Sequence, residues 1–234
     1  MKKAFNVAQL ERMKEKTMGL TGEWREAFGD PPLSGIWLIW GNSGSGKSSF
    51  VMQLTTVLCS IYKKVIYDSM EEAVSLSFRQ RLKTFGMEDV RNRLVVLPNE
   101  HYDDLMKRIE QKAAPKAIII DSWQYSGASW IDYKKMKEKH PDKLFVIISH
   151  AEGKMPKTRS ANSIMYDADV KIYVEGYRAI CKGRFTPAPG SFFTIWKEGA
   201  DRYWGEKQQQ QQDASEDYEG ADYEDTDDTS EEGL

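Results

Sequence analysis

The sequence predicts an α/β fold with a mainly parallel twisted sheet, and three observations lead to this prediction. From Gly35 onward, short apolar runs alternate with helical stretches of ten or more residues, which is typical of βαβ units. A glycine-rich segment joins the first apolar run to a helical stretch. Beyond Asp169, three apolar runs follow one another too closely for helices to lie between them. We therefore expect parallel strands at residues 36–40, 65–67, 94–97, 117–120 and 144–148, and an antiparallel extension at 170–174, 178–181 and 192–196.

The segments on either side of this core have a different character. In residues 1–30, apolar side chains recur at helical spacing among many charges, and Pro31 and Pro32 end the pattern. The chain ends with five glutamines and then an acidic run without apolar periodicity, which cannot bury enough surface to offset the entropy of ordering. We expect a helical arm over 1–30, one core domain over 31–206 and a disordered acidic tail over 207–234.

Composition limits the compartment and the type of partner. The two cysteines, Cys59 and Cys181, lie far apart, so the sequence suggests neither a disulfide framework nor a zinc site. No window approaches the roughly 20 apolar residues that cross a bilayer, and charges interrupt the basic start before any apolar stretch, so we expect a cytoplasmic protein.

Residues 208–234 hold eleven of the 36 Asp and Glu residues and none of the 33 Lys and Arg. The rest of the chain is therefore basic, which favours an anionic partner.

The glycine-rich segment matches the phosphate-binding pattern Gly-x-x-x-x-Gly-Lys-Ser, directly after an expected strand and before an expected helix. Glycines let such a loop point its N–H groups inward, and the following helix adds its positive end. Lys47 would reach the β- and γ-phosphates of ATP, and the Ser48 hydroxyl would bind Mg²⁺. The expected ATP-binding residues are Gly41, Asn42, Ser43, Gly44, Ser45, Gly46, Lys47, Ser48 and Ser49.

A second acidic element follows at Asp121, which ends the apolar run 117–120. Beside a phosphate loop, this carboxylate is expected to hold a water on the magnesium ion. An apolar run that ends in Asp is common among strands, so this prediction depends on the loop.

From Gly35 to Gly205 the chain resembles the core of the RecA-like ATPases, which include RecA and RadA recombinases, DnaB-type helicases and shortened phage relatives. The motifs that carry the resemblance come in the family order: Gly-Asn-Ser-Gly-Ser-Gly-Lys-Ser-Ser at 41–49, Ser-Met-Glu-Glu at 69–72, Ile-Ile-Ile-Asp-Ser at 118–122, Ile-Ile-Ser-His at 147–150, Asp-Ala-Asp-Val at 167–170 and Lys-Gly-Arg at 182–184. The resemblance implies ATP hydrolysis with Mg²⁺, in a bacterial or phage-infected host cell.

The resemblance also implies catalytic roles. Glu71 resembles the base that activates the attacking water, although Glu72 could take this role, or the pair could simply begin the next helix. His150 resembles the polar sensor of the γ-phosphate, or is an ordinary strand end. Lys182 and Arg184 resemble the Lys-x-Arg pair that such ATPases insert into a neighbouring subunit's site, or form a basic surface hairpin.

In recombinases and ring helicases the loop after the sensor binds single-stranded DNA, and here it carries Lys154, Lys157 and Arg159. Bases could stack on nearby aromatic residues, which are Trp123, Tyr125, Trp130 and Tyr166. Of these, Trp123 and Tyr125 could equally be core residues. Residues 5–8 match the Phe-x-x-Ala pattern with which recombinase arms dock onto a neighbour, or belong to a simple amphipathic helix. The acidic tail could restrain access of DNA, bind a basic protein partner or serve only solubility.

These expectations favour a DNA-stimulated ATP hydrolase that acts in recombination, repair or single-strand annealing, similar to a shortened phage recombinase. The partners would be single-stranded DNA and further copies of the chain in a ring or filament. Two alternatives stay open: a ring-forming helicase motor or loader, and a regulatory ATPase of this fold that does not act on DNA.

Overall fold

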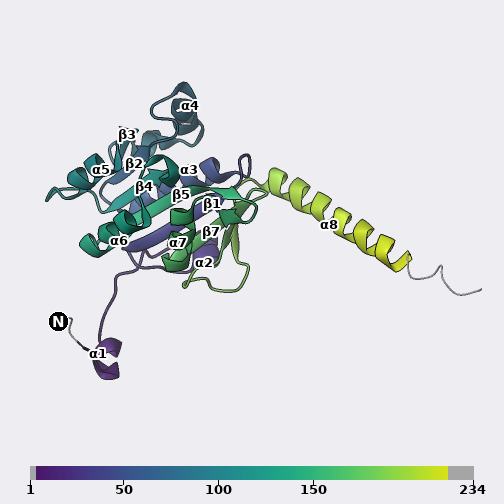
Figure 1. The fold of residues 1–234 in the computed structure, drawn as a ribbon, viewed down its shortest axis with the longest axis horizontal. Helices are drawn as coiled ribbons and strands as arrows, with labels where there is room; N and C mark the ends of the chain where they lie inside the picture. The colour runs from purple at the N-terminus through teal and green to yellow at the C-terminus, as the bar shows by residue number, and fades with distance from the viewer. Residues whose placement is uncertain (1–3, 221–234) are drawn as a thin grey trace, which may run out of the picture.

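The computed structural model describes residues 4–220, with side chains as far as Gln209, and within this range it forms one nine-stranded sheet (Figure 1). The strand order is β3-β2-β4-β5-β1-β7-β8-β9, with β6 paired to β5. The pairs that join β3, β2, β4, β5, β1 and β7 are parallel, and those of β7–β8, β8–β9 and β5–β6 are antiparallel. This confirms the predicted fold class. The strands are β1 (Gly35–Gly41), β2 (Val65–Ser69), β3 (Leu94–Pro98), β4 (Ala117–Asp121), β5 (Leu144–Glu152), β6 (Met155–Pro156), β7 (Val170–Glu175), β8 (Arg178–Cys181) and β9 (Phe192–Thr194).

Helices cover both faces of the sheet, and β1 shows how its alternating side chains divide the core. Trp37 and Ile39 pack into one cluster with α2 and α3, whereas Leu38 and Trp40 pack into the other with α5, α6 and α7.

Among the described residues, no helix is both long and apolar enough to span a membrane. The helices are α1 (Val7–Glu11), α2 (Gly22–Phe28), α3 (Lys47–Ile61), α4 (Leu76–Thr84), α5 (Tyr102–Ile109), α6 (Trp130–Lys139), α7 (Arg159–Asp167) and α8 (Lys197–Gly220), with 3₁₀ turns η1 (Met87–Val90) and η2 (Trp123–Tyr125).

The N-terminal arm is shorter than expected, because α2 belongs to the core. Trp24 and Phe28 lie one turn apart on the same helix face. Trp24 stacks on Phe193 at 4.4 Å between ring centroids, and the fully buried Phe28 contacts Trp37 at 6.1 Å. Within the expected arm, the segment around α1, whose residues are all exposed, stands away from the body (Figure 1).

The C-terminal segment also differs from the expectation, since α8 continues as a helix to Gly220 and projects away from the body (Figure 1). Its first turns are anchored, because the Trp204 indole donates to the carbonyl of Gly176 and Lys207 pairs with Glu175 at 2.8 Å. Once a helix is nucleated, each added residue costs little, and glutamine is a good helix former. α8 thus runs across the expected boundary at residue 207, and the disorder of the acidic tail stays a prediction. Residues 221–234 of the expected tail lie outside the described residues.

Asp68, in β2, is a buried carboxylate whose titration should change the stability of the fold. Burial raises the pKa of Asp68 from 3.8 to about 7. Its Oδ1 accepts a hydrogen bond from the Glu100 backbone at 3.0 Å, whereas its buried Oδ2 has no partner among the described residues. Above pH about 4 the unfolded chain releases a proton that the folded chain retains up to pH about 7. The free energy of unfolding should therefore fall as pH rises through this window.

Asp68→Asn removes the titrating group and keeps the acceptor for the Glu100 backbone. We expect it to stabilise the chain by roughly 1–3 kcal/mol at pH 8 and to change stability little at pH 4. Urea unfolding of both proteins at pH 4, 6 and 8 measures this difference. An equal difference at all three pH values would show that Asp68 does not titrate between the folded and unfolded states in this range.

Candidate nucleotide site

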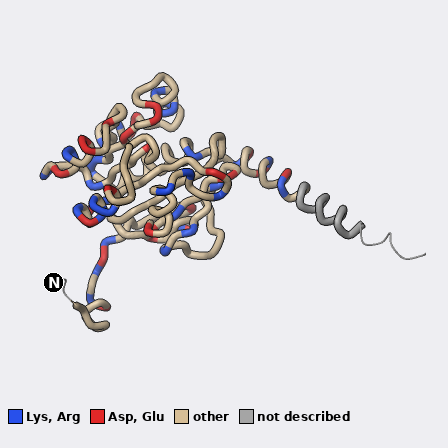
Figure 2. Tube along the Cα trace, in the orientation of Figure 1, with Lys and Arg blue, Asp and Glu red and all other residues tan. Residues whose placement is uncertain are grey.

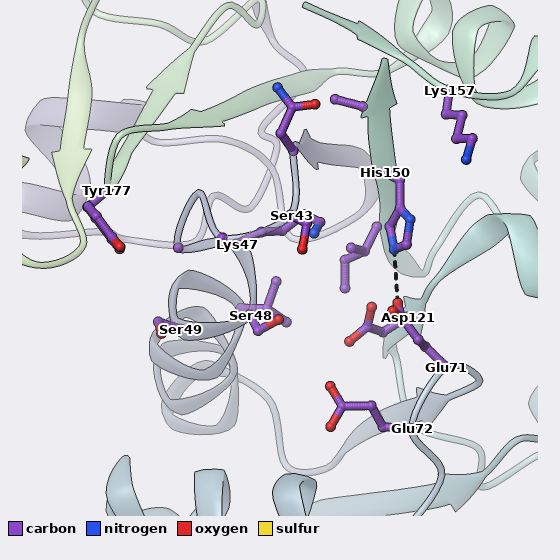
Figure 3. Close-up of a pocket in the computed structure, with 16 residues that line it drawn as sticks. Ser43, Lys47, Ser48, Ser49, Glu71, Glu72, Asp121, His150, Lys157 and Tyr177 are labelled. Carbon is purple, nitrogen blue, oxygen red and sulfur yellow. Dashed lines mark hydrogen bonds and ion pairs between the residues drawn. The ribbon is translucent and has the colours of Figure 1, made fainter. Parts of the chain in front are cut away.

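The candidate site is a pocket of about 540 Å³ at the edge where the parallel strands β1, β2, β4 and β5 end (Figure 3). Carboxyl ends of parallel strands meet at one edge of a sheet, so motifs from distant parts of the chain converge there. The lining residues are Asn42, Ser43, Gly44, Gly46, Lys47, Ser48, Ser49, Val51, Glu71, Glu72, Asp121, Ile148, His150, Ala151, Lys157 and Tyr177.

The phosphate loop lies between β1 and α3, as its sequence predicts. Gly44 and Gly46 have φ values of 75° and 98°, a left-handed conformation that favours glycine. α3 begins at Lys47, so its N-terminal N–H groups face the pocket and provide a site for an anion. Seven of the nine expected ATP-binding residues line the pocket. The other two, Gly41 and Ser45, are not among the lining residues, and the Ser45 carbonyl accepts a hydrogen bond from the backbone of Tyr177.

Ser48 and Asp121, the two residues expected to hold magnesium directly and through a water, both line this pocket (Figure 3). Burial and the charges of Glu71 and Glu72 raise the pKa of Asp121 above its ordinary value, although a hydrogen bond from the Tyr67 hydroxyl and the charge of Lys47 oppose this shift. A bound cation would favour the charged form of this carboxylate. One hydroxyl and one carboxylate suit Mg²⁺, which usually takes one or two protein ligands and completes its shell with water and phosphate oxygens.

The two glutamates after β2 have different partners. Glu71 accepts a hydrogen bond from Ser122 at 3.3 Å, and its Oε2 lies 3.0 Å from His150 Nε2 (Figure 3). Glu72 instead forms an ion pair with Arg81 at 2.8 Å and accepts a hydrogen bond from Ser77. Glu72 is thus held by α4, whereas Glu71 faces a polar side chain across the pocket. These contacts favour Glu71 over Glu72 as the base.

Comparison with known proteins gives distant relatives. No family model matches the chain. A DNA repair protein named RadA from Chlamydia trachomatis is 28% identical over 102 residues, which are 43% of this chain and 22% of that protein. Two solved structures each cover 76% of this chain and 93% of their own at 16% identity: flagellar accessory protein FlaH from Methanocaldococcus jannaschii, with a TM-score of 0.55, and a KaiC-like protein from Pyrococcus horikoshii, with a TM-score of 0.56. The chain has the fold of the RecA-like ATPases.

In this RecA-like core, Lys182 and Arg184 lie away from the pocket. β8 ends at Cys181, before both residues, so strand alternation does not place them on one side. Lys182 lies over the Tyr173 ring at 5.3 Å, and Arg184 pairs with Asp169 at 3.2 Å. Asp169 in turn accepts a hydrogen bond from Ile36 at the start of β1. Arg184 therefore lies near the start of β1, roughly the length of that strand from the phosphate loop. The Lys182 ammonium lies farther along, beside Tyr173, which pairs with Trp40 near the end of β1. Neither residue is among those that line the pocket.

The basic segment after His150 is not one irregular loop in this RecA-like core. It forms the β5–β6 hairpin and then α7, with Lys154 near the hairpin turn and Arg159 as the first helical residue. Lys157 lines the nucleotide pocket, apart from the other two cations. In Figure 2, Lys and Arg occur in many segments of the body with Asp and Glu between them.

The aromatic residues near this segment also separate into two groups. Trp123 is buried and donates to Ser160 at 3.0 Å, and Trp130 stacks on Tyr133 at 5.0 Å. Of these four residues, Tyr125 and Tyr166 are the exposed ones and are the most open to a stacked base.

Sequence reasoning did not identify Tyr177, which lines the RecA-like pocket on the side opposite His150 (Figure 3). Gly176 and Tyr177, with φ values of 51° and 58°, form the two-residue turn between β7 and β8. A Cβ added to Gly46 would lie 3.0 Å from the Tyr177 ring. The spacing of the two apolar runs predicts a hairpin, but only the tertiary structure places its turn against the phosphate loop.

Proposed function

We propose that this chain hydrolyses ATP and couples hydrolysis to single-stranded DNA in recombination, repair or strand annealing. The observation that carries the proposal is the convergence of three elements in one pocket. These elements are the phosphate loop, the Ser48–Asp121 pair and Glu71 with its partner His150. Separately each motif is common, but together they provide anion binding, a metal position and a base.

The proposed chemistry assigns a task to each group. The N–H groups of the loop and Lys47 bind the phosphates, while Ser48, and Asp121 through a water, would hold Mg²⁺, which would neutralise negative charge on the phosphates. Glu71 accepts the proton of the attacking water. Ser122 and His150 hold the Glu71 carboxylate in place by the contacts described above.

The proposed DNA partner is supported by the name of the RadA relative and by exposed aromatic and basic side chains between residues 125 and 166. Tyr125 and Tyr166 expose their rings, and Lys154 and Arg159 are exposed cations in the same part of the chain. Rings of this kind stack on bases, and cations of this kind bind backbone phosphates. The KaiC-like and FlaH structures support a second candidate, a regulatory ATPase that does not act on DNA. A helicase motor or loader is the remaining alternative.

The proposed assembly into a ring or filament is supported by unpartnered surfaces. β3 is an edge strand, and a hollow of about 280 Å³ beside it is lined by Leu82, Met87, Leu94 and Val96 among others. In the α1 segment Val7, Leu10 and Met13 are all exposed. A neighbouring copy would bury both surfaces and bring Lys182 and Arg184 to a second site. A basic protein partner for the acidic tail is a further proposal, and the compartment proposed is the cytoplasm.

The experiment that tests this function measures ATP hydrolysis with and without single-stranded DNA. We expect Mg²⁺-dependent turnover that rises several-fold with an oligonucleotide and loses this stimulation at high salt, because phosphate contacts release counterions. A rate of ATP hydrolysis that does not change when DNA is added would favour the regulatory candidate. Annealing of complementary strands without unwinding of a duplex separates the annealing role from the helicase role.

A further inference from the structure

We propose that Lys157 is a second cation of the nucleotide site, which binds the terminal phosphate of ATP within the same subunit. The inference rests on the proposed ATP-binding function and deepens it. It also moves Lys157 from the expected DNA-binding set into the nucleotide pocket, which it lines together with Lys47 and His150.

The β5–β6 hairpin explains why Lys157 faces the pocket. Ala151 pairs with Pro156, and the Lys157 backbone N–H donates to the carbonyl of His150 at 2.9 Å. Residues opposite each other across an antiparallel pair project their side chains from the same face. Because His150 points at Glu71 in the pocket, its cross-strand neighbour Lys157 points to the same side. Figure 3 shows Lys157 and His150 together on one wall.

The hairpin is tied to the phosphate loop and to β1, so the position of Lys157 relative to the phosphates is defined. The Asn42 side chain donates to the carbonyl of Gly153 at 3.3 Å, and the Trp40 indole donates to the carbonyl of Lys154 at 3.0 Å. Tyr173 adds a contact to Gly153 at 3.4 Å. The loop that binds phosphate and the hairpin that carries Lys157 therefore form one unit.

Charge supports a phosphate as the ligand of Lys157. The ammonium has no ion-pair partner among the described residues, whereas Glu72 is already paired with Arg81. Lys157 lies on the Glu71 and His150 side of the pocket, and Tyr177 lies on the opposite side (Figure 3). In the proposed mechanism the water attacks beside Glu71, so the terminal phosphate lies at this end. Lys157 should therefore distinguish ATP from ADP.

The test compares Lys157→Met with Lys135→Met, an exposed lysine on α6 that does not line the pocket. Equilibrium binding is measured for ADP and for a non-hydrolysable ATP analogue, both with Mg²⁺. We expect Lys157→Met to weaken binding of the analogue about tenfold or more and to leave ADP binding within about twofold. The reason is that the lost hydrogen bond joins the Lys157 ammonium to the third phosphate, which ADP lacks. The control should match the wild type for both ligands.

A DNA titration without nucleotide distinguishes the two possible sources of phosphate. If Lys157→Met keeps the wild-type preference for the ATP analogue but weakens oligonucleotide binding and its salt dependence, Lys157 binds DNA and the inference is overturned. Equal weakening for the analogue and ADP would also overturn it. If the wild type binds neither nucleotide, the proposed function itself fails. If the wild type binds both nucleotides and Lys157→Met still prefers the ATP analogue over ADP, only the inference about Lys157 fails.

Discussion

Lys47→Ala is expected to lower kcat/KM for ATP by about a thousandfold or more. Lys47 is the first residue of α3, and its side chain reaches the same pocket as Asp121 and Glu71. In the proposed mechanism its ammonium is the cation at the phosphate loop, where negative charge is concentrated in both the ground and transition states. Removing a group that stabilises such charge in an enclosed site typically costs two to three orders of magnitude, and the loss of phosphate binding adds to this.

The measurement is steady-state ATP hydrolysis, with the thermal midpoint of unfolding as a control for folding. Lys47 has no hydrogen bond or ion pair to another side chain among the described residues, and alanine is the best helix former, so the midpoint should change by only a few degrees. Lys47→Arg keeps the charge but not the shape, and should recover only a small part of the activity. Turnover by Lys47→Ala within tenfold of the wild type would show that hydrolysis does not occur at this loop.

The parallel sheet could be predicted because each buried strand is a continuous apolar run in the local sequence. Residues 118–120, three consecutive isoleucines, are fully buried in β4, and residues 144–148 are buried in β5. A strand buried on both faces gives a continuous apolar run, which needs no knowledge of its partners. The phosphate loop could be predicted for a similar reason, since its conformation depends on nearby glycines and on one strand and one helix beside it.

The features that sequence reasoning missed depend on contacts between distant segments. Trp24 in α2 joins the core through Phe193, and nothing near either residue indicates this pairing. The position of Lys157 depends on the short β6 strand, whose two residues are too few to give a periodic pattern. Lys182 and Arg184 follow a recognisable motif, but the motif does not show that β8 ends before them or that Arg184 pairs with Asp169.

The choice between Glu71 and Glu72 could not be made from the sequence, because adjacent glutamates have the same chemistry. The structure gives them different surroundings, since Arg81 holds one and His150 faces the other. A base must have a free carboxylate oxygen near the attacking water. The two side chains therefore form a matched pair for an experiment.

Glu71→Gln should lower kcat by about a hundredfold to ten-thousandfold, the usual contribution of a general base, with nucleotide affinity within a few-fold of the wild type. Glutamine has the same shape and can still contact Ser122 and His150, so the loss would report the missing base. Glu72→Gln should reduce kcat less than about tenfold and should lower the free energy of unfolding by up to about 1 kcal/mol, because it weakens the partly exposed Arg81 pair.

Single-turnover hydrolysis with measured nucleotide affinity separates these effects, because it reports the chemical step without product release. If Glu72→Gln showed the larger loss in the chemical step, the ion pair with Arg81 would have to open when ATP binds, and α4 would then move with the nucleotide. If neither variant slowed the chemical step by more than about tenfold, the water would be activated by the γ-phosphate itself. Glu71 would then be a group that positions His150, because the Oε2–Nε2 contact of 3.0 Å is its one described link across the pocket.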